Sequence, residues 1–454
     1  MLRHIVLMLV SNIQTVKADE SDNALKNYFP DISKETQAWI YQNVQTLIKK
    51  EEENELEQFH ESLIDPELIR NFSKSIKVPQ EHVIFSIDFG GSSLKITPVK
   101  ISFCEENLLK PVFESLESFN CVYKDWLEKE NKEKNENNKI INMKWYEWTV
   151  KRISEYLANN STIELDPNVP HYAAFTFSST LKQESLDSAT VKDFNKPFLF
   201  ADKKSLNGSN VVEDLNNELK DQRINIIVNC VLNDVVATYV TGVASQLVNP
   251  IALIIGTGTN AGFSISAKKG EKIINSEMAQ FSIPETCLDK ATKSIIEAPN
   301  NTFHRLEVTI AGMKFAEIVE AATKELWKQE QIMDLPANFY VDCIKKCLDM
   351  KPLDSPIEKL INKIVRRIRR RAYKLVSPII YAASKNLPFS VIVNGTIACS
   401  ALDNAIFQEE LKKYLPKGKS TLPEIILNNE ASLFGSAYVS LVYSTLKKKE
   451  NLLN

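Results

Sequence analysis

The sequence predicts an α/β protein built from two lobes. Three short polar runs carry this prediction, and each lies where an apolar run ends: SIDFGGSSLKI (86–96), VLNDVVAT (231–238) and LIIGTGTNAGF (253–263). Short apolar runs bounded by glycine or polar residues are typical of buried strands. The first and third runs contain glycine turns that suit phosphate groups. Two such turns imply a nucleotide clamped between two lobes.

The first run predicts a phosphate-binding hairpin. Residues 83–87 have the character of a strand, Asp88 follows it, and Gly90 and Gly91 allow a tight turn before residues 94–99 run back. Because glycine has no Cβ, backbone N–H groups can approach an anion closely. Asp88 can hold the water shell of Mg²⁺, which favours a few carboxylates together with phosphate oxygens.

The other two runs add a second turn and a candidate base. The turn is residues 256–258, with a threonine hydroxyl between two glycines. Asn233 and Asp234 follow a predicted strand (226–232) and precede a helical stretch (235–247). Phosphoryl transfer to an alcohol needs positioning, charge neutralisation and one carboxylate to accept the hydroxyl proton. We therefore expect Asp234 to be the base.

Seven motifs, in order along the chain, resemble those of the hexokinase family of sugar kinases. They are FSIDFGGSSLKI (85–96), AFTFSST (174–180), LNDVVAT (232–238), IIGTGTNAGF (254–263), NSEMAQF (275–281), RLEVTIAGMKFAEIV (305–319) and VIVNGTI (391–397). The resemblance runs from about Val83 almost to the C-terminus. Each motif alone is weak, but seven in the family order are specific.

The resemblance implies a two-lobed, actin-like (ribonuclease H-like) ATPase fold with the ligand cleft between the lobes. Each lobe would contain a five-stranded mixed sheet flanked by helices. The expected division is a helical N-terminal prefix (1–78) packed on the large lobe, a small lobe (79–234), a large lobe (235–438) and a C-terminal helix (439–454) that returns to the small lobe. Helical spacing of apolar residues from Glu35 to Ile64 supports the helical prefix.

The resemblance also implies the roles of individual residues. Asp234 would activate the sugar's 6-hydroxyl. The residues that would bind the sugar besides Asp234 are Ser178, Asn195, Lys196, Asn233, Asn260, Glu277 and Glu307, with Lys196 also reaching the transferred phosphoryl group. ATP would be held by Asp88, Gly90, Gly91, Ser92, Thr257, Gly258, Gly395 and Thr396. Asp88 would hold Mg²⁺ through water.

Several positions depart from the family pattern. The sugar loop reads Ser178-Ser179-Thr180 where Ser-aromatic-Pro is usual, Asn195 replaces a threonine, and Asn394 replaces an aspartate. The best interpretation is ATP-dependent phosphorylation of a glucose-like hexose at its 6-hydroxyl. An N-acetylhexosamine kinase, for example one acting on N-acetylglucosamine, is an alternative because the altered loop could admit a 2-acetamido group. A sugar-sensing regulatory protein with little activity is another, because loosely supported sites lose precision.

Composition agrees with an ordinary cytoplasmic enzyme. A chain of 454 residues with 44% apolar content can bury the cores of two lobes. The net charge of −3 gives no electrostatic reason to expect nucleic acid. Seven cysteines without a CxxC pair indicate reduced thiols, and no stretch reaches the roughly 18 apolar residues of a membrane span. The sequence makes no prediction of oligomeric state.

Two charged segments have ordinary structural interpretations. Residues 124–142 are rich in Lys, Glu and Asn, which predicts a solvated insertion in the small lobe. The arginine-rich segment 366–371 could suggest a nucleic-acid patch. Apolar residues recur through it at helical intervals, however, so we expect an amphipathic surface helix.

Overall fold

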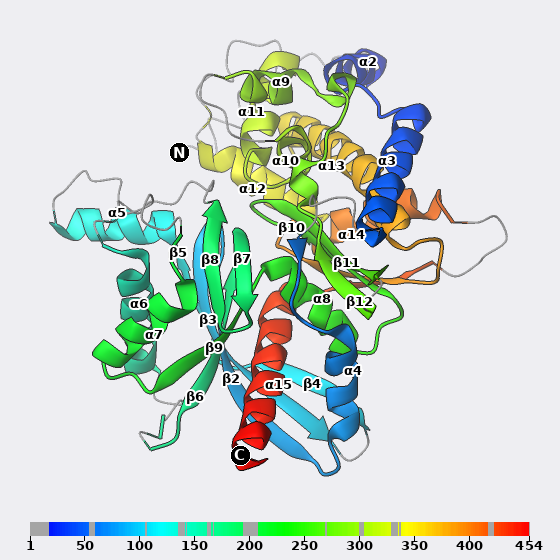
Figure 1. Ribbon diagram of the computed structural model, residues 1–454. Helices are drawn as coiled ribbons and strands as arrows, with labels where there is room; N and C mark the ends of the chain where they lie inside the picture. Colours follow the sequence, from blue (N-terminus) through cyan, green and yellow to red (C-terminus); the bar gives the residue numbers. More distant parts are fainter. Residues whose placement is uncertain are drawn as a thin grey trace.

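The computed structural model describes residues 18–53, 60–104, 107–134, 141, 143–160, 165–166, 168–193, 208–267, 270–298, 304–327, 335, 337–415 and 422–453. Its framework is two mixed sheets, one in each lobe (Figure 1). A separate hairpin, β7 (Thr180–Ser185) with β8 (Ser188–Asp193), stands beside the small-lobe sheet.

The small-lobe sheet collects three parallel strand ends at one edge. Its strands are β2 (Gln80–Phe89), β3 (Ser93–Cys104), β4 (Asn107–Ser115), β5 (Phe119–Val122), β6 (His171–Phe177) and β9 (Ile226–Leu232). The order is β4-β3-β2-β6-β9, with β5 paired to β3. Because β2, β6 and β9 are parallel, the residues at their carboxyl ends meet: Asp88, Ser178 and the Asn233–Asp234 pair.

Helices cover both faces of this sheet. Side chains alternate along β2, so Phe85, Ile87 and Phe89 contribute to one buried cluster and Ile84 to another. The first cluster also contains Trp148 and other residues from α6 (Trp145–Asn159) and α7 (Val211–Asp221). The second joins the sheet to the helices between the lobes.

The large-lobe sheet has the order β1-β12-β11-β10-β13-β14. Its strands are β1 (His60–Glu61), β10 (Pro250–Ile255), β11 (Thr259–Ala267), β12 (Gly270–Asn275), β13 (Ser390–Asn394) and β14 (Glu424–Leu427). Each sheet thus has six strands among the described residues, and the expectation of five was wrong. Two of the strands, β1 with two residues and β5 with four, are too short to stand out in an apolar pattern.

The N-terminal helices pack on the large lobe. These are α2 (Ala18–Tyr28) and α3 (Lys34–Glu52), and α3 lies against α13 (Pro356–Ala383) through Ile40, Val44 and Ile48. Of the helix predicted from Glu35 to Ile64, the described residues contain α3 and a non-helical segment (60–64), and residues 54–59 lie outside the described residues. At His60 the chain is extended, and two of the apolar residues that suggested helix, Trp39 and Leu63, are exposed.

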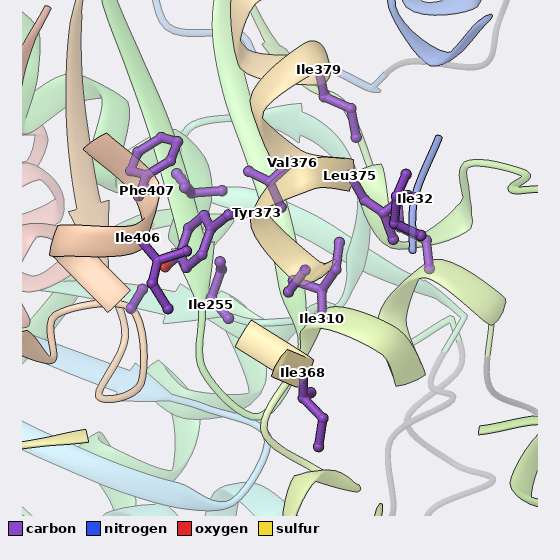
Figure 2. Close-up of a cluster of buried hydrophobic side chains, with 14 of the residues drawn as sticks. Ile32, Ile255, Ile310, Ile368, Tyr373, Leu375, Val376, Ile379, Ile406 and Phe407 are labelled. Atoms are coloured by element: carbon purple, nitrogen blue, oxygen red, sulfur yellow. The ribbon is translucent and has the colours of Figure 1, made fainter. Parts of the chain in front are cut away.

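The long helix α13 is the centre of the large-lobe core. Around it lie α9 (Lys290–Ile296), α10 (Arg305–Ile310), α11 (Phe315–Leu326), α12 (Ala337–Leu348) and α14 (Ala401–Lys412). Figure 2 shows Ile368, Tyr373 and Leu375 of α13 among buried residues of β10, α10 and α14. The rings of Tyr373 and Phe407 stack with centroids 5.0 Å apart.

Three helices form the connection between the lobes: α4 (Pro66–Ser75), α8 (Asp234–Ala244) and α15 (Ala431–Leu453). In Figure 1, α15 (red) runs along the small-lobe sheet beside α8. Their backbones are so close that a Cβ at Gly435 would lie 1.8 Å from the Ala237 carbonyl oxygen. The Thr241 hydroxyl also donates to the Ala431 carbonyl at 2.5 Å. Only glycine fits at position 435.

The arginine-rich segment is helical, as expected, but it does not lie wholly on the surface. Arg369 and Arg371 are 0% and 1% exposed. Arg369 makes a forked contact with Asp403, with its Nη2 2.7 Å from Oδ2, and Arg371 donates to Asp289 at 2.9 Å. The prediction of a surface helix was therefore wrong for these two side chains. Their partners lie 34 and 82 residues away in sequence, beyond the reach of helical periodicity.

The charged insertion (124–142) is helical as far as Lys134. Helix α5 (Tyr123–Lys134) exposes Lys124, Asp125 and Glu128 and buries Leu127. Most of residues 135–142 lie outside the described residues. Among the helices that are described, none is long and apolar enough to cross a membrane.

The two neighbouring arginines 369 and 370 give a matched stability test. Arg369→Ala should lower the free energy of unfolding by about 3–5 kcal/mol, because it leaves the Asp403 carboxylate buried without its charged partner. Arg370→Ala removes an exposed pair with Glu409 and a longer contact, 3.8 Å, with the buried Glu410, which keeps its ion pair with Lys413. It should lower the free energy of unfolding by about 1 kcal/mol or less. Chemical denaturation of both variants measures the difference, and equal effects would contradict a buried ion pair at Arg369.

Candidate active site

The carboxyl-terminal edges of both sheets border one cavity of about 470 Å³. The predicted site residues that line it are Asp88, Gly90, Gly91, Ser92, Ser178, Asn233, Asp234, Thr257, Gly258, Asn260, Glu277, Glu307, Gly395 and Thr396. Asn195 and Lys196 lie outside the described residues. Residues from motifs up to about 300 positions apart in sequence thus share one cavity.

The first glycine turn joins β2 to β3. The Gly90 N–H donates to the Ser93 carbonyl at 3.0 Å, and a Cβ at Gly90 would lie 3.1 Å from that oxygen. Neither Gly90 nor Gly91 has a positive φ, so close approach rather than a left-handed backbone favours glycine here. Burial, and after it the charge of Asp88, raises the pKa of Tyr123. Its protonated hydroxyl donates to the Gly90 carbonyl at 3.0 Å.

Asp88 lies beside this turn with a fixed orientation. It is directly opposite Lys95 in the β2–β3 pair, and cross-strand partners project on the same face. The Thr176 hydroxyl donates to Asp88 Oδ1 at 2.9 Å. A carboxylate held in this way at the end of a strand suits a hydrated Mg²⁺, which usually keeps several waters and takes one or two protein carboxylates. Among the described residues no group of three or more His, Cys, Asp or Glu side chains could hold a metal by itself.

The second glycine turn joins β10 to β11 and is supported from behind. Gly256 N–H donates to the Gly258 carbonyl at 2.9 Å, and Gly312 N–H donates to the Gly256 carbonyl at 2.7 Å. At the end of β13, Gly395 has a φ of 114°, and a Cβ there would lie 2.3 Å from the Ile255 carbonyl. Glycine is required at position 395 for both reasons.

The two turns touch each other across the cleft. The hydroxyl oxygens of Ser92 and Thr257 are 3.1 Å apart, one on each lobe. The turns therefore face the same space, as their pairing in the sequence predicted.

Asp234 occupies the first turn of α8. The N-cap residue Asn233 accepts a hydrogen bond from the Val235 N–H at 3.0 Å. Asp234 Oδ1 accepts from the same N–H at 2.9 Å, and Oδ2 accepts from the Ser178 hydroxyl at 2.7 Å. A helix N-terminus stabilises a carboxylate. The half-buried Asp234 is thus held in one orientation by both of its oxygens.

The large lobe contributes its own polar side chains to the cavity. Glu277 follows β12, and Glu307 lies in α10, close to the second glycine turn. A Cβ at Gly258 would lie 2.9 Å from Glu307 Oε1. Asn260, near the start of β11, is joined to Glu277 through Asn275: Asn260 donates to Asn275, and Asn275 donates to Glu277, both at 2.8 Å.

Sequence reasoning missed several residues that line the same cavity. They are Lys95, Asn120, Ser179, Gln280, His304 and Met313. Lys95 pairs with Asp88 across the β2–β3 hairpin. Because the sequence predicted this hairpin, Lys95 could have been noticed. His304 precedes the predicted helix start at Arg305, and this position also could have been noticed. The loop geometry that brings Gln280 and Met313 to the cleft has no signal in a local pattern.

Comparison with known proteins shows a similarity to hexokinases. A sequence model described as "Hexokinase" matches residues 36–244. Hexokinase-9 of Oryza sativa is 23% identical over 288 residues, which cover 60% of this chain and 53% of that protein. Hexokinase-1 of Spinacia oleracea is 24% identical over 268 residues, 56% of this chain and 50% of that protein. The chain thus spans about half the length of these relatives.

A solved structure shows the same fold. The hexokinase from Schistosoma mansoni complexed with glucose superposes with a TM-score of 0.70 at 19% identity, covering 94% of this chain and 98% of that one. The predicted two-lobed, actin-like fold is confirmed by this likeness. With these matches, the chain is similar in sequence to plant hexokinases over part of its length and has the hexokinase fold.

Proposed function

We propose that the protein is a sugar kinase that transfers a phosphoryl group from ATP to the 6-hydroxyl of a glucose-like hexose. The observation that carries this proposal is the position of Asp234. It lines the cavity together with the glycine turns of both lobes and with Glu277 and Glu307 of the large lobe. A base between a phosphate site and a polyol site has the arrangement that transfer to an alcohol requires.

The sugar would lie on the side of Asn260, Glu277 and Glu307. Carboxylate and amide groups suit this task because each sugar hydroxyl is both a donor and an acceptor. Ser178 and Asn233 would approach it from the small lobe. Asn195 and Lys196 are proposed on the resemblance alone. The glucose complex of the schistosome hexokinase supports a glucose-like ligand for this fold.

ATP would lie between the two glycine turns, with its phosphates near Lys95. The Lys95 ammonium supplies positive charge on the face that Asp88 occupies. Asp88 would hold Mg²⁺ through water, and the ion would neutralise phosphate charge when bound. Gly395 and Thr396 at the end of β13 would contact the rest of the nucleotide.

Within this site each protein group has a simple task. Asp234 accepts the hydroxyl proton as the oxygen attacks, which needs a free carboxylate lone pair within reach of the sugar. The Ser178 hydroxyl keeps Asp234 Oδ2 in one orientation. Glu277, Glu307 and Asn260 hold the sugar so that its hydroxyl stays aligned, and alignment supplies much of the rate in such reactions. All seven cysteines are free, in keeping with the cytoplasm as the proposed location.

Asp234→Asn tests the base. The amide has the same shape but cannot accept the proton, so turnover should fall by about 10²–10⁴ while sugar affinity changes little. Coupled ADP release across glucose, other hexoses and hexosamines, with ATP and Mg²⁺, gives the rates, and calorimetry gives the affinity. Asp221→Asn, which changes an exposed carboxylate of α7, is the matched control.

Three outcomes would contradict parts of the proposal. Wild-type turnover in Asp234→Asn would remove that residue as the base. Sugar binding by the unmodified protein without turnover, across the whole panel, would instead favour a sugar sensor, and turnover only with N-acetylhexosamines would change the substrate.

Gly91→Val tests the nucleotide side. A branched side chain in the turn should keep the backbone N–H groups away from phosphate oxygens, so ATP affinity should fall by about tenfold or more, the loss of one or two charge-assisted hydrogen bonds. Sugar affinity, measured by calorimetry on the same protein, should remain and serves as the internal control. Unchanged ATP affinity in the folded variant would exclude the hairpin as a phosphate site.

A further inference from the structure

One buried amide joins two of the residues that would bind sugar. Asn275 is the last residue of β12, where it lies between β11 and β1, opposite Gly262 and His60. It is only 5% exposed and does not line the cavity. Both of its side-chain atoms are nevertheless occupied by groups from the site.

The oxygen of Asn275 accepts two hydrogen bonds. Asn260 Nδ2 donates to Asn275 Oδ1 at 2.8 Å, and the Glu277 N–H donates to the same oxygen at 3.3 Å. The nitrogen, Nδ2, donates to Glu277 Oε1 at 2.8 Å. A carboxylate needs a donor and an N–H needs an acceptor, so the amide has only one consistent orientation.

The orientation of Asn260 is fixed in the same way. Its Oδ1 accepts from the N–H groups of Ala261 at 2.8 Å and Met278 at 3.2 Å. Its nitrogen must therefore face Asn275, and one N–H of that nitrogen is used there. What remains for a ligand is a single donor, the other N–H of Asn260.

Glu277 also depends on Asn275 for its backbone. Its φ and ψ are both 46°, in the left-handed region that side-chain-bearing residues seldom adopt. Asn275 contacts both its N–H and its carboxylate, and these contacts offset the strain of that conformation. With Oε1 occupied, the other oxygen, Oε2, remains as an acceptor toward the cleft.

We propose that Asn275 is a positioning residue that presents Asn260 as a hydrogen-bond donor and Glu277 as an acceptor to the substrate. This inference rests on the proposed function. The substrate class it selects is a polyol whose hydroxyl groups accept from the amide and donate to the carboxylate at this place. Asn275 itself does not touch the ligand.

The first test is N275D. The new carboxylate still accepts from Asn260 and from the Glu277 N–H, but it offers no donor to Glu277 Oε1. The loss of a charge-assisted hydrogen bond should weaken glucose binding, measured by calorimetry at pH 8, by about tenfold or more. Two facing carboxylates retain a proton to higher pH than an isolated one. Binding should therefore recover several-fold between pH 8 and pH 6 as a shared proton restores the donor.

The charged groups near Glu277 are the same in N275D and in the unmodified protein. His60 on β1 interacts electrostatically with Glu277, and Lys192 on β8 interacts with His60. The pH dependence of glucose binding in N275D therefore supports the role of Asn275 only where it exceeds that of the unmodified protein. N404D, which adds the same charge on α14 away from the cavity, is the control and should bind glucose as the unmodified protein does.

The second test exchanges the amide and the carboxylate. In E277Q alone, the amide oxygen would accept from Asn275 and turn a donor toward the sugar, so binding should fall. In N275D/E277Q, the amide nitrogen can donate to the new carboxylate and leave its oxygen facing the sugar, as in the unmodified protein. The double variant should bind glucose several-fold more tightly than either single variant, without the added pH dependence.

Thermal unfolding at pH 6 and pH 8 separates this inference from the proposed function. The five proteins compared are the unmodified protein, N275D, E277Q, N275D/E277Q and N404D. If the unmodified protein binds neither glucose nor N-acetylglucosamine, the proposed function fails, while a midpoint lowered in N275D at pH 8 and restored in the double variant still supports the role of Asn275. The proposed role of Asn275 would be overturned if N275D bound glucose as tightly as the unmodified protein. It would also be overturned if the loss of glucose affinity in N275D were independent of pH and not relieved in the double variant. A double variant that does not fold would overturn it too.

Discussion

The close packing of α8 against α15 determines where the candidate base lies. Ala237 of α8 and Gly435 of α15 approach so closely that no side chain fits between them. On its other side, a Cβ at Gly242 of α8 would lie 2.8 Å from Pro250 at the start of β10. Helix α8 is thus tied to α15, which covers the small-lobe strands, and to the large-lobe sheet. Asp234 in its first turn therefore keeps a defined position relative to both sheets.

The buried arginines support, from a distance, the side of the cavity where we propose that the sugar binds. Arg369 binds Asp403 of α14 and also donates to the Ile310 carbonyl at the end of α10, at 2.7 Å. Glu307 lies in that short helix. Arg371 donates to Asp289, which in turn caps α9 through the Thr292 N–H. The segment that resembled a nucleic-acid patch is thus part of the framework behind the candidate site, and its charges are compensated inside the lobe.

Local patterns in the sequence predicted the glycine turns and the candidate base, and the resemblance of seven motifs to the hexokinase family predicted the two-lobed fold. A strand followed by glycines or by Asn233–Asp234 carries its chemistry at its own end. The burial of Arg369 and the role of Asn275 could not be predicted in this way. Both depend on partners that only the folded chain brings together, namely Asp403 and Asn260. Apolar periodicity also overestimated the length of the N-terminal helix, because Leu63 fits the helical spacing by chance but does not lie in a helix.

The most direct measurement is to identify the bond that the protein makes. Incubation with glucose, ATP and Mg²⁺, followed by proton–phosphorus correlation NMR of the products, locates the new phosphate ester. The account predicts phosphorus coupled to the two protons on carbon 6, in an amount equal to the ADP formed. Phosphorus coupled to another sugar position, or free phosphate as the only product beside ADP, would contradict it.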